Sequence, residues 1–279
     1  MRKIKIITDS SSNLYTLEGV NYETTPLKII TDSKEFTDDA NLDIEEMVNF
    51  LENYKGKSSS SCPNPDDWLN AFGDADEIFC ITITATLSGS YNSACTAKTI
   101  YEEQYPEKKI FVLNSLSTGP EMGLIAEKIK ALILENKDFD EICSHISEYS
   151  KKTALLFMLE SMHNLANNGR VSQIAAKAAG ILGIRVIGKA SEKGDLEQLN
   201  KCRGEKKAAE TVFAQMKKLG YNGGKVKISH CFNEQNGLKL KEIIEKEFEN
   251  PHITIDLCGG LCSFYAEKGG LLVGFEKGV

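Results

Sequence analysis

The stretch Ile78-Phe79-Cys80-Ile81-Thr82-Ile83, followed by Thr84-Ala85-Thr86-Leu87-Ser88-Gly89 and then by Ser90 to Tyr101, decides the fold class of this chain. Its first part predicts a buried strand, its second part a loop of small residues, and its last part a helix. Ile4 to Ile7 and Ile110 to Leu113 are two further predicted strands, with predicted helices after each. Strand, loop and helix repeated in this order predict an α/β fold with a parallel sheet covered by helices.

Two helix starts in this half are marked by their residue types. Asp43 to Tyr54 places Ile44, Met47, Val48 and Leu51 on one face of a predicted helix. Asn64 is an expected N-cap, with Pro65 at the first helical position. A third helix is expected from Pro120 to about Leu134.

The pattern changes after the apolar run from Ala154 to Leu159. A short helix and an Ala-rich helix are predicted first, and then helices alternate with strands, with a hairpin turn at Gly194-Asp195. The predicted helices are Met162–Asn167, Ser172–Gly180, Glu205–Leu219 and Asn233–Glu249, and the strands are Ile184–Ile187, Val226–Ser229, Ile253–Leu257 and Leu271–Phe275. We therefore expect two α/β domains, 1–160 and 161–279, the second with a mixed or antiparallel sheet.

Charge and composition exclude several classes of protein. The 279 residues carry a net charge of −7, which argues against a general nucleic-acid binder. The longest uncharged run, Ile78 to Ala97, holds too many hydroxyls to cross a membrane. The N-terminus lacks the apolar stretch of a signal peptide, so we expect a cytoplasmic protein. The eight scattered cysteines are expected to be free thiols, and Cys258 with Cys262 lacks the second pair that a zinc site needs.

One stretch imitates a nucleotide-binding loop. Gly183-Ile184-Arg185-Val186-Ile187-Gly188-Lys189-Ala190 fits Gly-x4-Gly-Lys, but Ala190 stands where a hydroxyl should ligate magnesium. Its β-branched centre predicts a strand instead of a phosphate loop. We therefore expect no nucleotide and no other cofactor.

Hydroxyl groups gather where predicted strands give way to helices, at Ser10 to Ser12, Ser58 to Ser61 and Thr86 to Ser93. In an open parallel sheet this edge binds ligands, because helix N-termini point free N–H groups towards it. Hydroxyls and amides without a metal motif suit a singly charged anion such as a carboxylate. The alternative is that these serines only cap helices and form turns.

Several motifs resemble, in order and spacing, those of the DegV family. They are Ile7-Thr8-Asp9-Ser10-Ser11-Ser12-Asn13-Leu14, Pro26-Leu27, Ser60-Ser61-Cys62-Pro63-Asn64-Pro65, Leu87-Ser88-Gly89-Ser90-Tyr91-Asn92-Ser93-Ala94, Asn168-Gly169-Arg170-Val171-Ser172 and Arg203-Gly204. The resemblance implies a two-domain α/β protein that holds a long-chain fatty acid between its domains. It also implies service as the fatty-acid-binding subunit of a bacterial fatty acid kinase, with a separate ATP-dependent subunit as partner.

The resemblance also assigns site residues. Ser61 and Ser93 match the two hydroxyls that bind the carboxylate, and the amides of Cys62 and Ala94 would complete the cradle. Arg170 matches the arginine of the Gly-Gly-Arg-Ile/Val-Ser motif, although from the residues alone it could equally cap the preceding helix.

Arg203 matches an arginine on the face offered to the kinase subunit, and from the residues alone it could equally be a solvated surface charge. One position departs from the family pattern, because Ala266 stands where counting back from Leu271 to Phe275 places the histidine of the usual His-x-Gly-Pro-Gly ending. A lipid-binding relative without kinase coupling is therefore an alternative.

These observations favour a fatty-acid carrier that catalyses nothing by itself. Two other classes stay open. The first is an enzyme acting on a carboxylated or phosphorylated metabolite, with Asp9 or Asp38 as the general base. The second is a lipid-sensing regulator that signals to a partner through Arg203.

Overall fold

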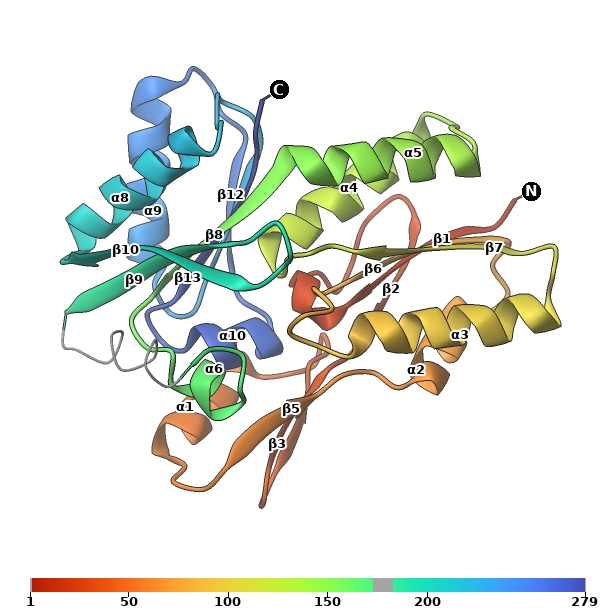
Figure 1. Ribbon diagram of the computed structural model, residues 1–279, viewed down its shortest axis with the longest axis horizontal. Coiled ribbons are helices and arrows are strands. Elements are labelled where there is room, and N and C mark those ends of the chain that lie inside the picture. Colours follow the sequence, from red (N-terminus) through yellow and green to blue (C-terminus); the bar gives the residue numbers. More distant parts are fainter. Residues whose placement is uncertain (1, 173–182, 279) are drawn as a thin grey trace.

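The computed structural model describes residues 2–172 and 183–278, and its N-terminal half is built on a parallel sheet (Figure 1). The strands pair in the order β2-β1-β6-β7, and every pair is parallel, as predicted. Their bounds are β1 Ile4–Asp9, β2 Asn21–Thr25, β6 Glu77–Thr82 and β7 Lys109–Asn114. Helices α2 (Pro65–Phe72) and α3 (Ser90–Gln104) cover one face, and α4 (Pro120–Leu134) and α5 (Phe139–Tyr149) cover the other.

The predicted helix starts are confirmed. Helix α1 (Ile44–Asn53) begins after Asp43, whose side chain accepts the N–H of Glu46. Asn64 and Asp67 form a reciprocal capping box at the start of α2, with Pro65 in its first turn. These side chains satisfy N–H groups that have no acceptor within the helix, so each helix begins at a defined residue.

The second sheet is mixed and has the strand order β10-β9-β8-β13-β11-β12. Its strands are β8 Thr153–Leu159, β9 Ile184–Ala190, β10 Leu196–Arg203, β11 Val226–His230, β12 Ile253–Leu257 and β13 Leu271–Glu276. Helices α8 (Glu205–Lys218) and α9 (Glu234–Glu247) pack on one face. Because β8 pairs with β9 and β13, this sheet begins at Thr153, ahead of the boundary expected near residue 160. The predicted turn at Gly194-Asp195 is confirmed, since it joins the antiparallel strands β9 and β10.

A small antiparallel sheet, which the sequence did not indicate, lies beside the two large ones. It consists of β3 (Lys28–Thr31), β4 (Glu35–Thr37) and β5 (Ser58–Ser61), in the order β4-β3-β5. Two short helices, α6 (His163–Asn167) and α10 (Gly260–Ala266), lie near it, together with α1 (Figure 1). Two 3-10 turns, η1 (Ser10–Ser12) and η2 (Ser150–Lys152), complete the described elements. The Ala-rich helix expected over 172–180 falls, apart from Ser172, outside the described residues.

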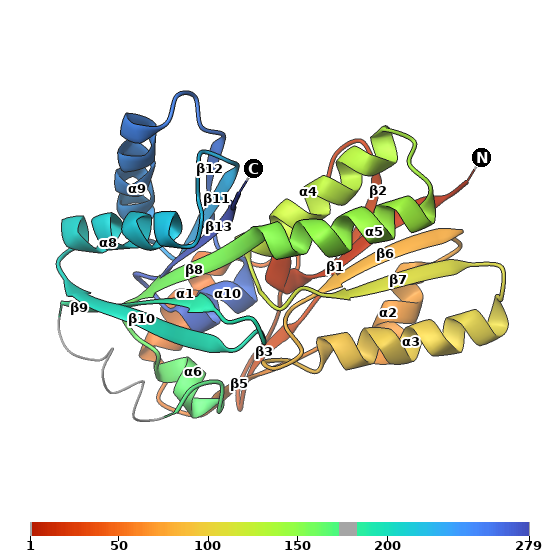
Figure 2. The ribbon, with the colours of Figure 1, turned by 45° about the horizontal axis from the view of Figure 1, so that its top comes forward.

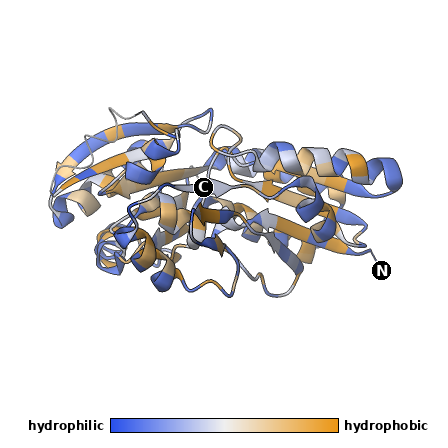
Figure 3. Cartoon of the chain, turned by 90° about the horizontal axis from the view of Figure 1, so that it is seen from below, coloured by the Kyte–Doolittle hydropathy of each residue, from blue (hydrophilic) through white to orange (hydrophobic). Residues whose placement is uncertain are grey.

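The core is organised by alternation along the strands. Ile6 packs towards α4 and Ile7 packs towards α2 and α3, and both are fully buried. Figure 3 shows hydrophobic residues along the strands and hydrophilic residues on the outer sides of the helices. Helix α4 packs on β1 and β6 of the first sheet and on β11 and β13 of the second (Figure 2). It therefore ties the two halves of the molecule together. Within the described part of the chain, no helix is both long and apolar enough to cross a bilayer.

Candidate functional site

A mostly apolar cavity of about 290 Å³ lies where the three sheets meet. Its apolar lining consists of Leu27, Ile83, Leu87, Leu155, Phe157, Leu159, Leu165, Leu196, Leu261, Ala266 and Leu272. Its polar side chains are those of Ser60, Ser61, Cys62, Ser88, Thr118, Arg170, Cys262 and Tyr265. An apolar chamber with a few polar groups suits a ligand that is mostly hydrocarbon and has a polar end.

Four of the residues predicted for the site border this cavity, namely Ser61, Cys62, Arg170 and Ala266. Ser61 is the last residue of β5 and pairs with Lys28 of β3. The Sγ of the next residue, Cys62, lies 3.1 Å from the point where Gly89 would carry a Cβ. The end of β5 thus meets the loop that enters α3.

Ser93 lies one helical turn beyond that contact. It is the fourth residue of α3, and its N–H donates to the carbonyl of Gly89, which borders the cavity. Its Oγ is buried and has no hydrogen-bond partner in residues 2–172 and 183–278. A buried hydroxyl without a hydrogen-bond partner destabilises the folded state by about 1–3 kcal/mol, so we expect a ligand atom or a water molecule to bond to it. Ser93 is therefore suited to the hydrogen-bonding role that the sequence predicted.

Ala94 does not have the role expected of it. Its side chain is fully buried in the core that includes Trp68 and Phe72. It is the fifth residue of α3, so its N–H bonds within the helix. The N–H groups of the first turn, such as those of Tyr91 and Asn92, are the ones that a helix leaves available. This corrects the expectation that the Ala94 amide completes the cradle.

Arg170 is held against the loop that precedes α3. Its Nε donates to the carbonyl of Leu87 at 3.3 Å, and its guanidinium carbon lies 5.7 Å from the centre of the Tyr265 ring. The side chain is half-buried and borders the cavity. It thus brings a positive charge to the polar part of the lining.

Tyr265 is a site residue that the sequence analysis missed. Its hydroxyl lies 2.7 Å from the Oγ of Ser60, the neighbour of Ser61, and its ring borders the cavity. Burial raises the pKa of Tyr265, so its phenol keeps its proton and can donate a hydrogen bond. Ala266, at the position that the alignment gave to the histidine, also borders the cavity but is apolar. Tyr265 thus brings a hydrogen-bond donor to the lining next to Ala266.

Arg203 lies apart from the cavity lining. It is the exposed last residue of β10, and its Nε lies 3.8 Å from the Cβ position of Gly183. The structure therefore separates Arg203 from Ser61 and Arg170, consistent with a role on the surface.

The two candidate general bases, Asp9 and Asp38, are buried, and both oxygens of each carboxyl accept hydrogen bonds. One oxygen of Asp9 accepts the Ser90 hydroxyl at 2.6 Å and the Ile83 N–H at 2.8 Å, and the other accepts the Ser11 hydroxyl at 2.5 Å. Burial raises the pKa of the Asp9 carboxyl. This carboxylate therefore fixes the first residue of α3 to the end of β1.

Asp38 does the same for α10. It accepts the N–H groups of Gly260 at 2.6 Å and Leu261 at 2.9 Å, and the Tyr15 hydroxyl at 2.6 Å. Burial raises the pKa of this carboxyl too. Helix α10 carries Cys262, Tyr265 and Ala266 to the cavity, so Asp38 positions one of its walls.

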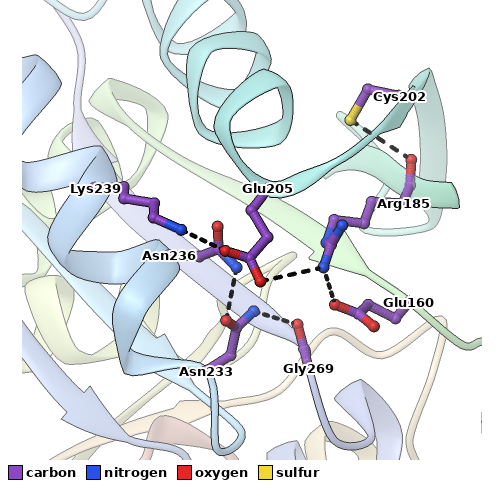
Figure 4. Close-up of polar contacts among 8 residues, drawn as sticks. All are labelled: Glu160, Arg185, Cys202, Glu205, Asn233, Asn236, Lys239 and Gly269. Atoms are coloured by element: carbon purple, nitrogen blue, oxygen red, sulfur yellow. Dashed lines mark hydrogen bonds and ion pairs between the residues drawn. The ribbon is translucent and has the colours of Figure 1, made fainter. Parts of the chain in front are cut away.

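A separate polar cluster lies in the second half of the chain (Figure 4). Arg185 of β9 contacts Glu160 at 2.6 Å and Glu205 at 3.9 Å, and Glu205 also pairs with Lys239 of α9. These contacts connect β9 with the start of α8 and, through Lys239, with α9. The cluster stabilises the packing of this half and lies outside the cavity.

In the stretch that fits Gly-x4-Gly-Lys, residues 184–190 form strand β9, as predicted. All eight cysteines are free thiols. Burial raises the pKa of the cavity thiol of Cys262 to about 12, so it is protonated and inert. Within residues 2–172 and 183–278, no three or more His, Cys, Asp or Glu side chains are grouped so that they could hold a metal ion.

Comparisons with known proteins agree with this description. The sequence profile of the DegV family, described as uncharacterised proteins, matches residues 3–277. A DegV domain-containing protein of Streptococcus pneumoniae is 45% identical over 276 residues, 98% of each chain. A DegV family protein from Eubacterium eligens, solved with heptadecanoic acid, is 45% identical with a TM-score of 0.96 and covers 99% of this chain and 100% of its own.

A second solved structure is the fatty acid kinase (Fak) B3 protein of Streptococcus pneumoniae loaded with linoleic acid. It is 43% identical, has a TM-score of 0.97, and both chains are covered completely. The family profile and these full-length relatives agree with the two-domain α/β fold. This chain belongs to the DegV family.

Proposed function

We propose that the protein binds a long-chain fatty acid in the cavity between its two domains, with the acyl chain against the leucines and the carboxylate near Ser61, Ser93 and Arg170. The observation that carries this proposal is the combination of an apolar chamber with the buried, unpartnered hydroxyl of Ser93, a residue whose N–H bonds to the carbonyl of the lining residue Gly89. A carboxylate oxygen would give that hydroxyl an acceptor. The fatty acids held by the Eubacterium eligens and Fak B3 proteins support the same ligand class.

The energetics favour a ligand with a long chain. Burying each CH2 group contributes about 0.8 kcal/mol, so a chain of ordinary length supplies most of the binding free energy. The hydroxyls and the arginine contribute less and fix the orientation of the carboxylate.

The protein is proposed to act as a carrier and not as an enzyme. The carboxylate oxygens of the candidate bases Asp9 and Asp38 already accept hydrogen bonds that hold α3 and α10 in place. By similarity to Fak B3, a separate ATP-dependent kinase subunit is the proposed partner, and the exposed end of β10 at Arg203 is a proposed contact. The free thiols fit the reducing cytoplasm.

The test begins with the protein purified from cells without added lipid. Organic extraction and mass spectrometry should recover fatty acid in near-stoichiometric amounts. The delipidated protein should then bind a C16 or C18 acid more tightly than the alcohol of the same length, because only the acid uses the cradle. A protein that carries no lipid and binds neither compound would contradict the proposal. Equal affinity for acid and alcohol would contradict the placement of the carboxylate.

A further inference from the structure

Strand β8 forms the main part of the cavity floor, and Leu196 of β10 and Leu272 of β13, in the same sheet, also line the cavity. Along β8, Leu155, Phe157 and Leu159 face the cavity, whereas Leu156 and Met158 face the core under α8 and α9. Phe157 is the middle residue of this floor and is 2% exposed. It is also the bulkiest side chain that β8 contributes to the lining.

The ring of Phe157 is seated on a glycine. In the sheet, Phe157 lies between Leu272 of β13 and Gly188 of β9. A Cβ placed on Gly188 would lie 2.2 Å from Cζ and 2.6 Å from Cε2 of Phe157. These two atoms form the far edge of the ring, so the ring leans from β8 across β9 and fills the space where residue 188 would carry a side chain.

The position of the Phe157 ring against Gly188 determines the width of the cavity over β8. With glycine at 188 the ring lies towards the sheet, whereas any larger residue would push its edge towards the cavity. We infer that Phe157, seated on Gly188, sets the width of the acyl cavity and so the shape of the acyl chain that it accepts; this inference rests on the proposed function. A cis double bond bends a chain and widens its path, so bent chains are the ones that depend on this room.

Three substitutions, two at Phe157 and one at Gly188, change the width of the cavity at this contact. Phe157→Leu removes the ring and widens the cavity, and Phe157→Trp narrows it. Gly188→Ala displaces the ring, but its Cβ would also lie 2.5 Å from the carbonyl oxygen of Glu197, so this variant strains the pairing of β9 with β10. The two Phe157 variants keep the inference testable if Gly188→Ala does not fold. Leu156→Ala is the matched control, because it creates a cavity on the same strand but on the opposite face.

The experiment is a competition between a straight and a bent chain. Each delipidated protein is incubated with equal amounts of stearic and linoleic acid, which have the same number of carbons, and the bound lipids are extracted and quantified by mass spectrometry. Relative to the wild type, Phe157→Trp and Gly188→Ala should move the bound ratio towards stearic acid by about fivefold or more, and Phe157→Leu should move it towards linoleic acid. Leu156→Ala should leave the ratio within about twofold.

The outcomes separate the inference from the function on which it rests. Folded Phe157 variants that bind lipid with the wild-type ratio would overturn the inference and leave the proposed function intact. The same shift in Leu156→Ala as in Phe157→Leu would also overturn it, because a general loosening of β8 would then explain the change. A wild-type protein that binds neither acid would overturn both.

Discussion

Replacing Ser93 by alanine should change stability and affinity in opposite directions. The buried Ser93 Oγ has no hydrogen-bond partner among the described residues. Such a group costs the folded state about 1–3 kcal/mol, and alanine removes this cost while leaving only a small void. We expect Ser93→Ala to stabilise the delipidated protein by about 1 kcal/mol, which corresponds to roughly 2 °C in melting temperature for a chain of this size.

The same substitution should weaken fatty-acid binding. A hydrogen bond to a charged acceptor contributes about 1.5–3 kcal/mol, so affinity should fall by about ten- to a hundredfold. The alcohol of equal length should lose much less. Melting temperature is measured by calorimetry on delipidated protein, and affinity by displacement of a fluorescent fatty acid.

Ser90→Ala is the matched control on the same helix. The Ser90 hydroxyl donates to the buried carboxylate of Asp9 at 2.6 Å, so its loss should destabilise the protein by about 1–3 kcal/mol. A Ser93→Ala protein that melts lower than the wild type and binds the acid with unchanged affinity would refute the reasoning, since the hydroxyl would then serve the fold and not the ligand.

Three further predictions concern Tyr265, Asp9 and the strand over residues 184–190. Tyr265→Phe removes the hydroxyl that contacts Ser60, and it should weaken binding of the acid by a few-fold while leaving the alcohol unaffected; equal losses for both would place that hydroxyl away from the carboxylate. The amount by which Asp9→Asn lowers the free energy of unfolding, relative to the wild type, should become smaller as pH rises from about 4 to about 8. Burial raises the folded-state pKa of Asp9, so the protonated form favours folding and the wild type loses that contribution as pH rises through the folded-state pKa. Urea unfolding of delipidated protein across this range measures the difference, and a constant difference would contradict the assignment. The isolated protein should show no binding of Mg-ATP in calorimetry, because residues 184–190 form a strand; a micromolar dissociation constant would contradict this.

The elements that the sequence predicted well are those with local signals. Asn64 and Pro65 mark the start of α2 because the capping groups lie within one turn of each other. The turn at Gly194 could be predicted because its φ of 85° is a conformation that glycine adopts readily. Such signals need only a few neighbouring residues, so they can be read without knowing the tertiary structure.

The apolar cavity had no such signal. Leu27, Leu196 and Leu272 meet there from distant parts of the chain, and in the sequence each resembles any other core leucine. Tyr265 was missed for a related reason, because an aromatic residue in an apolar stretch is usually part of a core. Strand β5 was not predicted since its four serines carry no apolar alternation. Only the polar end of the cavity, where hydroxyls follow strands, could be located before the structure.

The buried carboxylates show why the residue types at a site do not decide its chemistry. Asp9 and Asp38 stand near the motifs, as a general base would, but their oxygens hold α3 and α10 in place. They therefore shape the walls of the cavity without lining it. In the described lining, the one charged side chain is that of Arg170, so an incoming carboxylate meets a cation and hydroxyl donors, and is not repelled by an exposed acid at the same place. Because Asp9 and Asp38 bond to α3 and α10 and do not line the cavity, a protein with a net charge of −7 can still have a site suited to an anion.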